Sequence, residues 1–418
     1  MSNLAISGGP KVRTELFPDQ NTIDEHEIDA VKKVMQRGRL SGYRGNWCPE
    51  FYGGPTVQEL EKTWAERFCA KHAIAVNSAT SGLHVACGAL GLQPGDEVIV
   101  SPYSMTCSAT SPMIYGALPV FADIEPDFFC LDPKCVEAKI TSKTKAIIPV
   151  SLFGQPYDPE INDIARRHNL LVIEDAAQAL GSFRKADGKA AGTFGHIGIF
   201  SFNYGKHLTC GEGGMIVTDD DELALYCRLI RNHAEAVING MPDEIRLSVD
   251  TRTVGFNMRM TEVNAAIVIE QLKKQRDLQF LRDINSAYLI DGLRKIPAIA
   301  PAPVRPGFEH TYYALPFLWD STLADGIHRD VFINAVKAEL TERKGREGEG
   351  VPIGCGYITP LYKMPLFDFP DGLCPVCERL SYHDLFLTLY HAPNSTLKDI
   401  DDVIFAFKKV WENRADLV

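Results

Sequence analysis

Short apolar runs alternate with segments of helical periodicity between Ala73 and Val217, and this alternation limits the folds open to the chain. It predicts strands at 73–77, 97–100, 118–122, 145–150, 170–174, 197–202 and 214–218, with helices near 81–91, 106–115, 133–140 and 158–168. Such alternation is typical of a mostly parallel sheet covered by helices on both faces. Because ligands of these sheets bind at the carboxyl ends of the strands, we expect residues that directly follow strands to meet there.

The chain ahead of this region predicts an extended arm to about residue 21, two helices and a long loop. Thr22-x-x-Glu25 has the pattern of a capping box, and three apolar residues at helical spacing then predict the buried face of a helix: Ile28, Val31 and Met35. The segment 39–55 is rich in Gly and aromatic residues and predicts a loop. Thr56-x-x-Glu59 predicts the start of a second helix, with an apolar face of Leu60, Trp64 and Phe68.

A long helical pattern follows Thr261 and predicts a connection into a second, smaller domain. That domain is expected to contain a strand at 311–318, a helix at 330–341 and a final helix at 397–412. The predicted organisation is therefore an N-terminal arm (1–21), a large domain (22–275) and a small C-terminal domain (276–418).

Composition restricts the possible partners. The 418 residues include 54 acidic and 43 basic side chains, a net charge of −11, which disfavours binding to nucleic acid. No apolar run approaches the roughly 18 residues of a membrane span, and no secretion signal is visible, so we expect a soluble cytoplasmic protein. Cys374-Pro-Val-Cys377 has metal-ligand spacing but lacks a second pair. We therefore expect reduced thiols and no metal site.

Lys206 and Asp175 are the strongest candidates for catalysis. Each stands at or just beyond the end of a predicted buried strand. A pyridoxal-phosphate (PLP) enzyme needs this pair, because the lysine forms a Schiff base with the cofactor aldehyde and the carboxylate keeps the pyridinium nitrogen protonated. The alternatives are a surface lysine and an aspartate that only caps a helix.

A candidate phosphate site lies in Asn77-Ser-Ala-Thr-Ser-Gly82, which links a predicted strand to a helix. Backbone N–H groups at a helix N-terminus bind phosphate readily. Ser201, five residues before Lys206, is close enough to join the same phosphate. An ordinary capped turn is the alternative for this segment.

The order of these motifs resembles the DegT/DnrJ/EryC1/StrS family, which are sugar aminotransferases of PLP fold type I. The resemblance covers essentially the whole chain and includes further segments: Glu174-Asp-Ala-Ala-Gln178, Gly211-Glu-Gly-Gly214, Arg231-Asn-His233 and Gly255-Phe-Asn-Met-Arg-Met-Thr-Glu262. It implies an α/β fold with a mostly parallel central sheet in the large domain and a smaller α+β C-terminal domain.

The resemblance also implies roles for individual residues. Lys206 matches the Schiff-base lysine that shuttles the proton, Asp175 the partner of the pyridine nitrogen, and Gln178 a residue near the ring hydroxyl. The phosphate ligands would be Ser201, the backbone of Ala79 and Thr80, and Asn257 from the neighbouring subunit of a homodimer with a shared active site. Met105 departs from the family, which usually has an aromatic residue there to stack on the ring; a sulfur–π contact remains possible for it.

The implied activity is transfer of an amino group from L-glutamate or L-glutamine to a keto-sugar, with a nucleotide-linked sugar as the first choice and an inosose-type cyclitol ketone as the alternative. Family members that act as dehydratases have histidine in place of the lysine, so Lys206 favours transamination over dehydration. A PLP-binding protein without turnover is disfavoured because both Lys206 and Asp175 are present. The expected substrate contacts are Arg39, Tyr43, Arg259, His310 and Tyr357, although the aromatic residues and arginines of the 39–55 loop suit packing equally well.

Overall fold

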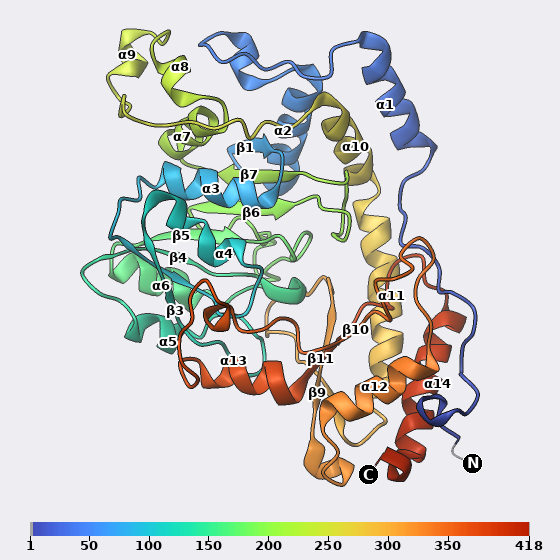
Figure 1. The fold of residues 1–418 in the computed structure, drawn as a ribbon. Coiled ribbons are helices and arrows are strands. Elements are labelled where there is room, and N and C mark those ends of the chain that lie inside the picture. Colours follow the sequence, from blue (N-terminus) through green and yellow to red (C-terminus); the bar gives the residue numbers. More distant parts are fainter. Residues whose placement is uncertain (1–2, 418) are drawn as a thin grey trace.

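The computed structural model describes residues 3–417 and contains two β-sheets (Figure 1). The larger sheet has seven strands in the order β1-β7-β6-β5-β4-β2-β3, and only β7 runs antiparallel to its neighbours. Its strands are β1 (His72–Val76), β2 (Glu97–Val100), β3 (Leu118–Phe121), β4 (Thr144–Ile148), β5 (Leu171–Asp175), β6 (Ile197–Ser201) and β7 (Gly214–Thr218). The prediction of a mostly parallel sheet is confirmed, and each predicted strand overlaps an observed one.

Helices cover both faces of this sheet because its strands are apolar on both sides. In β1, Ile74 and Val76 join a core with α3 (Ala79–Ala89), α5 (Pro133–Ala138), α6 (Glu160–Arg167) and α7 (Asp221–Arg231). The alternate residues Ala73 and Ala75 pack with α2 (Pro55–Phe68) and α10 (Glu262–Lys273). Alternation of side chains along the strand thus separates the two cores. The predicted helix at 106–115 is wrong as a single helix, because α4 (Cys107–Thr110) ends before Pro112 and a 3-10 turn follows.

The predicted start and buried face of the first helix are wrong. Helix α1 (Glu25–Arg37) begins after Asp24, whose side chain accepts a hydrogen bond from the His26 amide, and Glu27 completes the capping box in place of Thr22 and Glu25. Ile28 and Met35 are 51% and 56% exposed. The face that packs on α10 carries buried Glu27 and Val34 instead.

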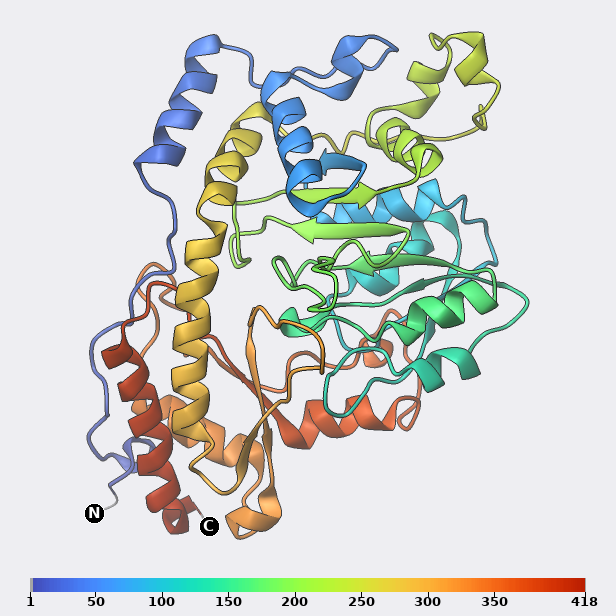
Figure 2. The same ribbon diagram turned by 180° about the vertical axis from the view of Figure 1, so that it is seen from behind.

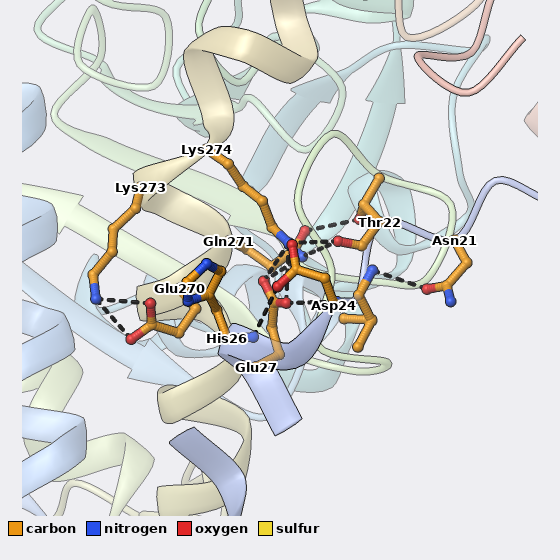
Figure 3. Close-up of polar contacts among 10 residues, drawn as sticks. Asn21, Thr22, Asp24, His26, Glu27, Glu270, Gln271, Lys273 and Lys274 are labelled. Carbon is orange, nitrogen blue, oxygen red and sulfur yellow. Dashed lines mark hydrogen bonds and ion pairs between the residues drawn. The ribbon is translucent and has the colours of Figure 1, made fainter. Parts of the chain in front are cut away.

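Polar contacts fix the start of α1 at a break between α10 and α11 (Gln275–Leu293) (Figure 3). Lys274 has non-helical backbone angles and interrupts the single long helix that the sequence predicts. Its ammonium lies 2.6 Å from the Thr22 carbonyl and 2.7 Å from the Asp24 carboxylate. Gln271 donates to Thr22 and Glu27. Charge and hydrogen bonding therefore hold this helix pair where the sequence predicted apolar packing.

Helix α2 is also capped in a way that its own sequence does not show. Thr56 and Glu59 form no capping box, because the helix begins at Pro55 and its N-cap Gly54 has no side chain. The amides of Thr56 and Val57 donate instead to the Glu262 carboxylate, which belongs to α10. The predicted apolar face of Leu60, Trp64 and Phe68 is buried as expected.

The C-terminal part contains a four-stranded antiparallel sheet in the order β10-β11-β9-β8. Its elements are β8 (Ile299–Pro301), β9 (Leu315–Trp319), α12 (Arg329–Glu339), β10 (Ile353–Cys355), α13 (Pro375–Arg379), β11 (Leu385–Thr388) and α14 (Leu397–Glu412). The arm runs beside α12 and α14 (Figures 1 and 2), and its Leu4 and Phe17 are buried in the core of this part. The predicted domain boundary near residue 275 falls beside the break at Lys274 and stays a prediction.

Two further observations concern the described residues, 3–417. No helix among them is long and apolar enough to cross a membrane. They contain no group of three or more His, Cys, Asp or Glu side chains arranged to hold a metal ion. Cys374 and Cys377 are both buried.

A buried ion pair joins two helices to the outermost strand of the large sheet. Arg231 of α7 is fully buried and donates to Glu61 of α2 at 2.5 Å and to the Ala75 carbonyl at 3.0 Å. Glu61 accepts the Ala75 amide at 2.8 Å. Both backbone groups of Ala75 are therefore satisfied by the two charged side chains.

Arg231→Met is expected to lower the free energy of unfolding by about 3–5 kcal/mol, because the change leaves Glu61 buried without a counter-charge. Urea titration of the cofactor-free chain measures this. The matched control is Arg252→Met, which removes an ion pair between an exposed arginine and Asp250 and should cost about 0–1 kcal/mol. Equal losses in the two variants would show that the buried pair has no special role.

Candidate active site

The carboxyl ends of the central strands open into a pocket of about 240 Å³. It is lined by most of the residues that the sequence singled out: Ala79, Thr80, Met105, Asp175, Gln178, Ser201, Lys206 and Tyr357. A larger surface hollow of about 600 Å³ beside Leu90 and Tyr226 shares no residue with this pocket and has no lysine in its lining. The smaller pocket is therefore the better candidate for chemistry.

Asp175 is the last residue of β5 and is 3% exposed. The Ser108 hydroxyl donates to its Oδ2 at 2.8 Å, and the Ala177 amide donates to its Oδ1 at 3.1 Å. Burial raises the pKa of this carboxyl, and the two hydrogen bonds and the charge of Lys206 oppose the rise. A buried carboxylate oriented in this way favours a cationic N–H group opposite it.

Lys206 reaches the same pocket from the turn that follows β6. The turn is closed by backbone hydrogen bonds, including Lys206 N to Asn203 O at 2.9 Å and Tyr204 N to Gly211 O at 3.0 Å. The Lys206 Nζ lies 4.3 Å from the centre of the Tyr313 ring. Within residues 3–417 it forms no ion pair with a carboxylate. Its amine is therefore available to a ligand.

The N-terminus of α3 forms an anion site at the edge of the pocket. Ser78 caps the helix by accepting the Ser81 amide at 3.0 Å. The amides of Ala79 and Thr80 have no acceptor in the part of the chain that the structure describes, and both residues line the pocket. Free amides at the start of a helix bind phosphate or carboxylate.

Gly214 allows the last strand to pass directly against this helix start. A Cβ atom at this position would lie 2.7 Å from the Ala79 nitrogen, a distance that side chains do not tolerate. Ser201, paired with Gly214 across β6 and β7, places its hydroxyl in the lining of the same pocket. The glycine therefore brings the helix amides and the serine of β6 together.

Gln178 and Tyr357 form a hydrogen-bonded pair on the lining of the pocket. Gln178 accepts the Phe153 amide at 2.9 Å and donates to the Tyr357 hydroxyl at 2.9 Å. Burial raises the pKa of Tyr357, so its hydroxyl keeps its proton at neutral pH. Met105, from the turn after β2, lines the pocket and is 53% exposed.

The structure does not bring the other predicted substrate contacts to this pocket within one subunit. Arg39 is exposed, and Tyr43 is half-buried against Arg231 and Arg259, with its ring 4.9 and 5.9 Å from their guanidinium carbons. His310 is buried and its Nδ1 accepts the Tyr312 amide. Burial lowers the pKa of His310 to about 3, so the imidazole is neutral.

Asn257 likewise lies outside the pocket of its own subunit. Its Oδ1 accepts the Arg259 Nε at 2.7 Å, and Arg259 also donates to Asn232 at 3.3 Å. These contacts fix Asn257 beside Arg259 near the end of β1, where Arg259 forms a backbone bridge to Val76.

Several pocket residues were not singled out as site residues from the sequence: Cys107, Glu212 and Tyr313, together with Ser108 behind Asp175. Ser104 and Asn203 also line the pocket, and the expectation that residues following the strands meet at one edge of the sheet covered both of them. Tyr313 precedes β9 of the other sheet, and no local pattern indicates that it reaches Lys206. Burial raises the pKa of the Cys107 thiol to about 11, which makes it a poor nucleophile at neutral pH.

Comparison with known proteins gives relatives of almost the same length. A putative L-glutamine:3-amino-2,3-dideoxy-scyllo-inosose aminotransferase of Streptoalloteichus tenebrarius is 33% identical over 99% of this chain and 98% of its own. GDP-perosamine synthase of Caulobacter vibrioides is 47% identical over 60% of this chain and 63% of its own.

Solved structures show the same fold. An aminotransferase from Psychrobacter cryohalolentis superposes with a TM-score of 0.81 at 30% identity, covering 95% of this chain and 99% of that one. DesI, solved in the presence of its TDP-sugar product, gives a TM-score of 0.83 at 28% identity and covers 99% of this chain and 98% of its own. A family model for the DegT/DnrJ/EryC1/StrS aminotransferases matches residues 21–408. With its lysine and aspartate in one pocket and this match over nearly its whole length, the chain belongs to the DegT/DnrJ/EryC1/StrS aminotransferase family.

Proposed function

We propose that the protein binds PLP and transfers an amino group from L-glutamate or L-glutamine to the ketone of a sugar or cyclitol. The observation that carries the proposal is the pocket that holds Asp175, Lys206 and the free amides at the start of α3. The 47% identity to GDP-perosamine synthase over part of the chain supports a nucleotide-linked keto-sugar as the acceptor. The full-length relative that bears an inosose aminotransferase name supports a cyclitol ketone as the second candidate.

The donor groups of the pocket fit PLP at each of its ends. The amides of Ala79 and Thr80 and the Ser201 hydroxyl suit a phosphate, and Asp175 suits a protonated pyridine nitrogen. The Lys206 amine suits the aldehyde carbon of the cofactor. When bound, PLP supplies an electron sink that stabilises negative charge on a carbon next to an amine.

Four residues of the pocket would have distinct roles in the transfer. Asp175, oriented by Ser108 and Ala177, would hold a proton on the ring nitrogen of the cofactor. The Lys206 Nζ would accept the α-proton of the donor and later return a proton to the product. The Tyr357 hydroxyl and the Gln178 amide, bonded to each other, limit the positions open to the ring beside them.

We also infer a homodimer in which each site is completed by the partner. Asn257 lies outside the pocket of its own subunit, although the family resemblance assigns it to the phosphate. The exposed apolar residues Ile28 and Met35 on α1 favour burial against another chain.

Lys206→Ala is expected to abolish amine transfer. Wild-type protein loaded with PLP and mixed with L-glutamate alone should release about one equivalent of 2-oxoglutarate per subunit, because only the first half of the exchange can occur. The variant should release none, and borohydride treatment should no longer fix PLP to the peptide that contains residue 206. Exposed Lys145→Ala serves as the control and should behave as wild type. Amine transfer that survives in the Lys206 variant would refute the proposed mechanism.

Asp175→Asn should lower amine transfer by about 10²–10³-fold, since it removes a preorganised charge from the ring nitrogen.

The same substitution should raise the stability of the cofactor-free chain at neutral pH. Burial raises the pKa of Asp175, so the folded state holds this proton more tightly than the unfolded state does. Wild-type stability therefore falls as the pH rises through the raised pKa. The Asn variant should be the more stable protein above that pH, and the difference should vanish below about pH 3.8. Urea titrations from pH 3.5 to 8 measure this, and a pH-independent difference would contradict it.

A shared site can be tested by mixing two inactive variants, Lys206→Ala and Asn257→Asp. The second variant keeps the contact with Arg259 but places a negative charge against the phosphate. Subunits that are unfolded and refolded together should regain about a quarter of wild-type activity, because half of the dimers are hybrids with one intact site. Each variant refolded alone is the control. If both residues act within one subunit, mixing restores nothing.

A further inference from the structure

A second cavity, of about 270 Å³, adjoins the first pocket at Lys206. The two share Asn203, Lys206 and Tyr313, so the lysine stands between them. The other walls of the second cavity come from α11, from the loop that carries Arg346 and Glu349, and from the junction between the arm and α1. No residue implied by the family resemblance, other than Lys206, lies in this lining.

The lining of the second cavity has more positive than negative charge. It contains Lys206, Arg282 and Arg346, and Glu349 is its one acidic residue. Arg346 is already engaged, since it lies 3.3 Å from Glu349 and 4.2 Å from the centre of the Tyr204 ring. In a chain with a net charge of −11, a local excess of this kind favours an anionic ligand.

Arg282 is half-buried, and its guanidinium has few hydrogen-bond partners within residues 3–417. Its one hydrogen bond within residues 3–417 runs from Nη1 to the Tyr312 carbonyl at 3.4 Å, and no carboxylate of that range pairs with it. Burial lowers the pKa of Arg282 to about 10, which still leaves it charged at neutral pH. Most of the five N–H donors of Arg282 therefore have no acceptor within residues 3–417, and the side chain lines the cavity.

The neighbouring histidine supplies no counter-charge. His207 lines the same cavity and is 5% exposed. Burial, followed by the charge of Arg282, lowers its pKa well below the ordinary value, so the imidazole is neutral. Among the described residues, the positive charge of Arg282 is therefore opposed mainly by Asp283, which lies outside the lining of the cavity.

We propose that this second cavity binds a carboxylate of the amino donor, with Arg282 as the principal ligand and Arg346 as the second. The proposal rests on the proposed aminotransferase function. An amino acid carries its α-carboxylate on the same carbon as the amine, so this anion must lie close to Lys206 during the exchange. The planar guanidinium suits a carboxylate in a two-bond arrangement.

A diphosphate fits this cavity less well than a carboxylate does. In a nucleotide-linked sugar the diphosphate is separated from the reacting ketone by the sugar ring, whereas the cavity begins at Lys206 itself. Glu349 at the cavity wall would repel a multiply charged group more strongly than a single carboxylate. Size agrees with this choice, because about 270 Å³ suits a small amino acid and not a nucleotide.

Hydrogen bonds tie the wall formed by Thr22 to the break between α10 and α11. Thr22 lines the cavity, and its carbonyl receives both Lys274 and Gln271 (Figure 3). The polar cluster at the helix break therefore positions one side of the proposed carboxylate site.

The test measures binding of glutarate, a dicarboxylate without an amine, to the PLP-loaded full-length chain by calorimetry. Arg282→Gln should weaken glutarate binding by about tenfold or more. Arg346→Gln should weaken it less, because Glu349 already neutralises part of that charge. The matched control is Arg276→Gln, an exposed arginine on the same helix, which should bind as wild type. Arg282→Lys, which keeps the charge without the planar fork, should fall between wild type and Arg282→Gln.

Steady-state kinetics separate the donor from the acceptor. Arg282→Gln should raise the KM for L-glutamate and leave the KM for the keto acceptor unchanged. Unaltered glutarate binding in a variant with the wild-type circular dichroism spectrum would overturn the proposal. The proposal would also be overturned if Arg282→Gln lost binding of inorganic diphosphate but kept binding of glutarate, because the cavity would then serve the acceptor.

Glutarate binding does not require turnover, so the two proposals fail separately. Absence of amine transfer by the wild type, with glutarate still bound through Arg282, would refute the function and leave the carboxylate site standing. Normal transfer with an unchanged donor KM in Arg282→Gln would refute the site and leave the function standing.

Discussion

Burial of one carboxylate at the end of β5 sets the conditions for the rest of the site. Asp175 is almost without solvent, and the Ser108 hydroxyl, the Ala177 amide and the charge of Lys206 compensate in part for that. An arrangement of this kind costs stability in the empty protein and gains it when a cation lies opposite. Lys206 and the α3 amides lie around the same pocket as this carboxylate. Together the three groups are complementary to a ligand that has a cationic ring and an anionic phosphate.

Much of the central sheet could be predicted because it depends on short-range patterns. Apolar runs bounded by turns located every strand, and residues at strand ends such as Ala79, Asp175 and Ser201 do line the pocket. Their assignment to a cofactor remains a prediction that geometry supports. What failed depends on distant contacts. The buried face of α1 could not be predicted, because Glu27 is buried by Gln271 and Lys274, more than two hundred residues away in the chain.

The substrate side of the site was harder to predict for the same reason. Tyr313 and Arg282 belong to the C-terminal half, and neither follows a strand of the large sheet. Their nearness to Lys206 arises from how α11 and the second sheet pack beneath the first (Figures 1 and 2). The family resemblance implied that His310 contacts the substrate; the structure buries its neutral imidazole, and the role toward a substrate stays a prediction.

The Arg231–Glu61 ion pair also affects whether the edge strand β1 can pair with another molecule. Strand β1 is at the border of the seven-stranded sheet, where an unpaired backbone would be a template for a strand of another molecule. Glu61 occupies the outward amide and Arg231 the outward carbonyl in the middle of that strand. Together with the bridge between Val76 and Arg259, the ion pair therefore leaves little of this border open to a strand of another molecule.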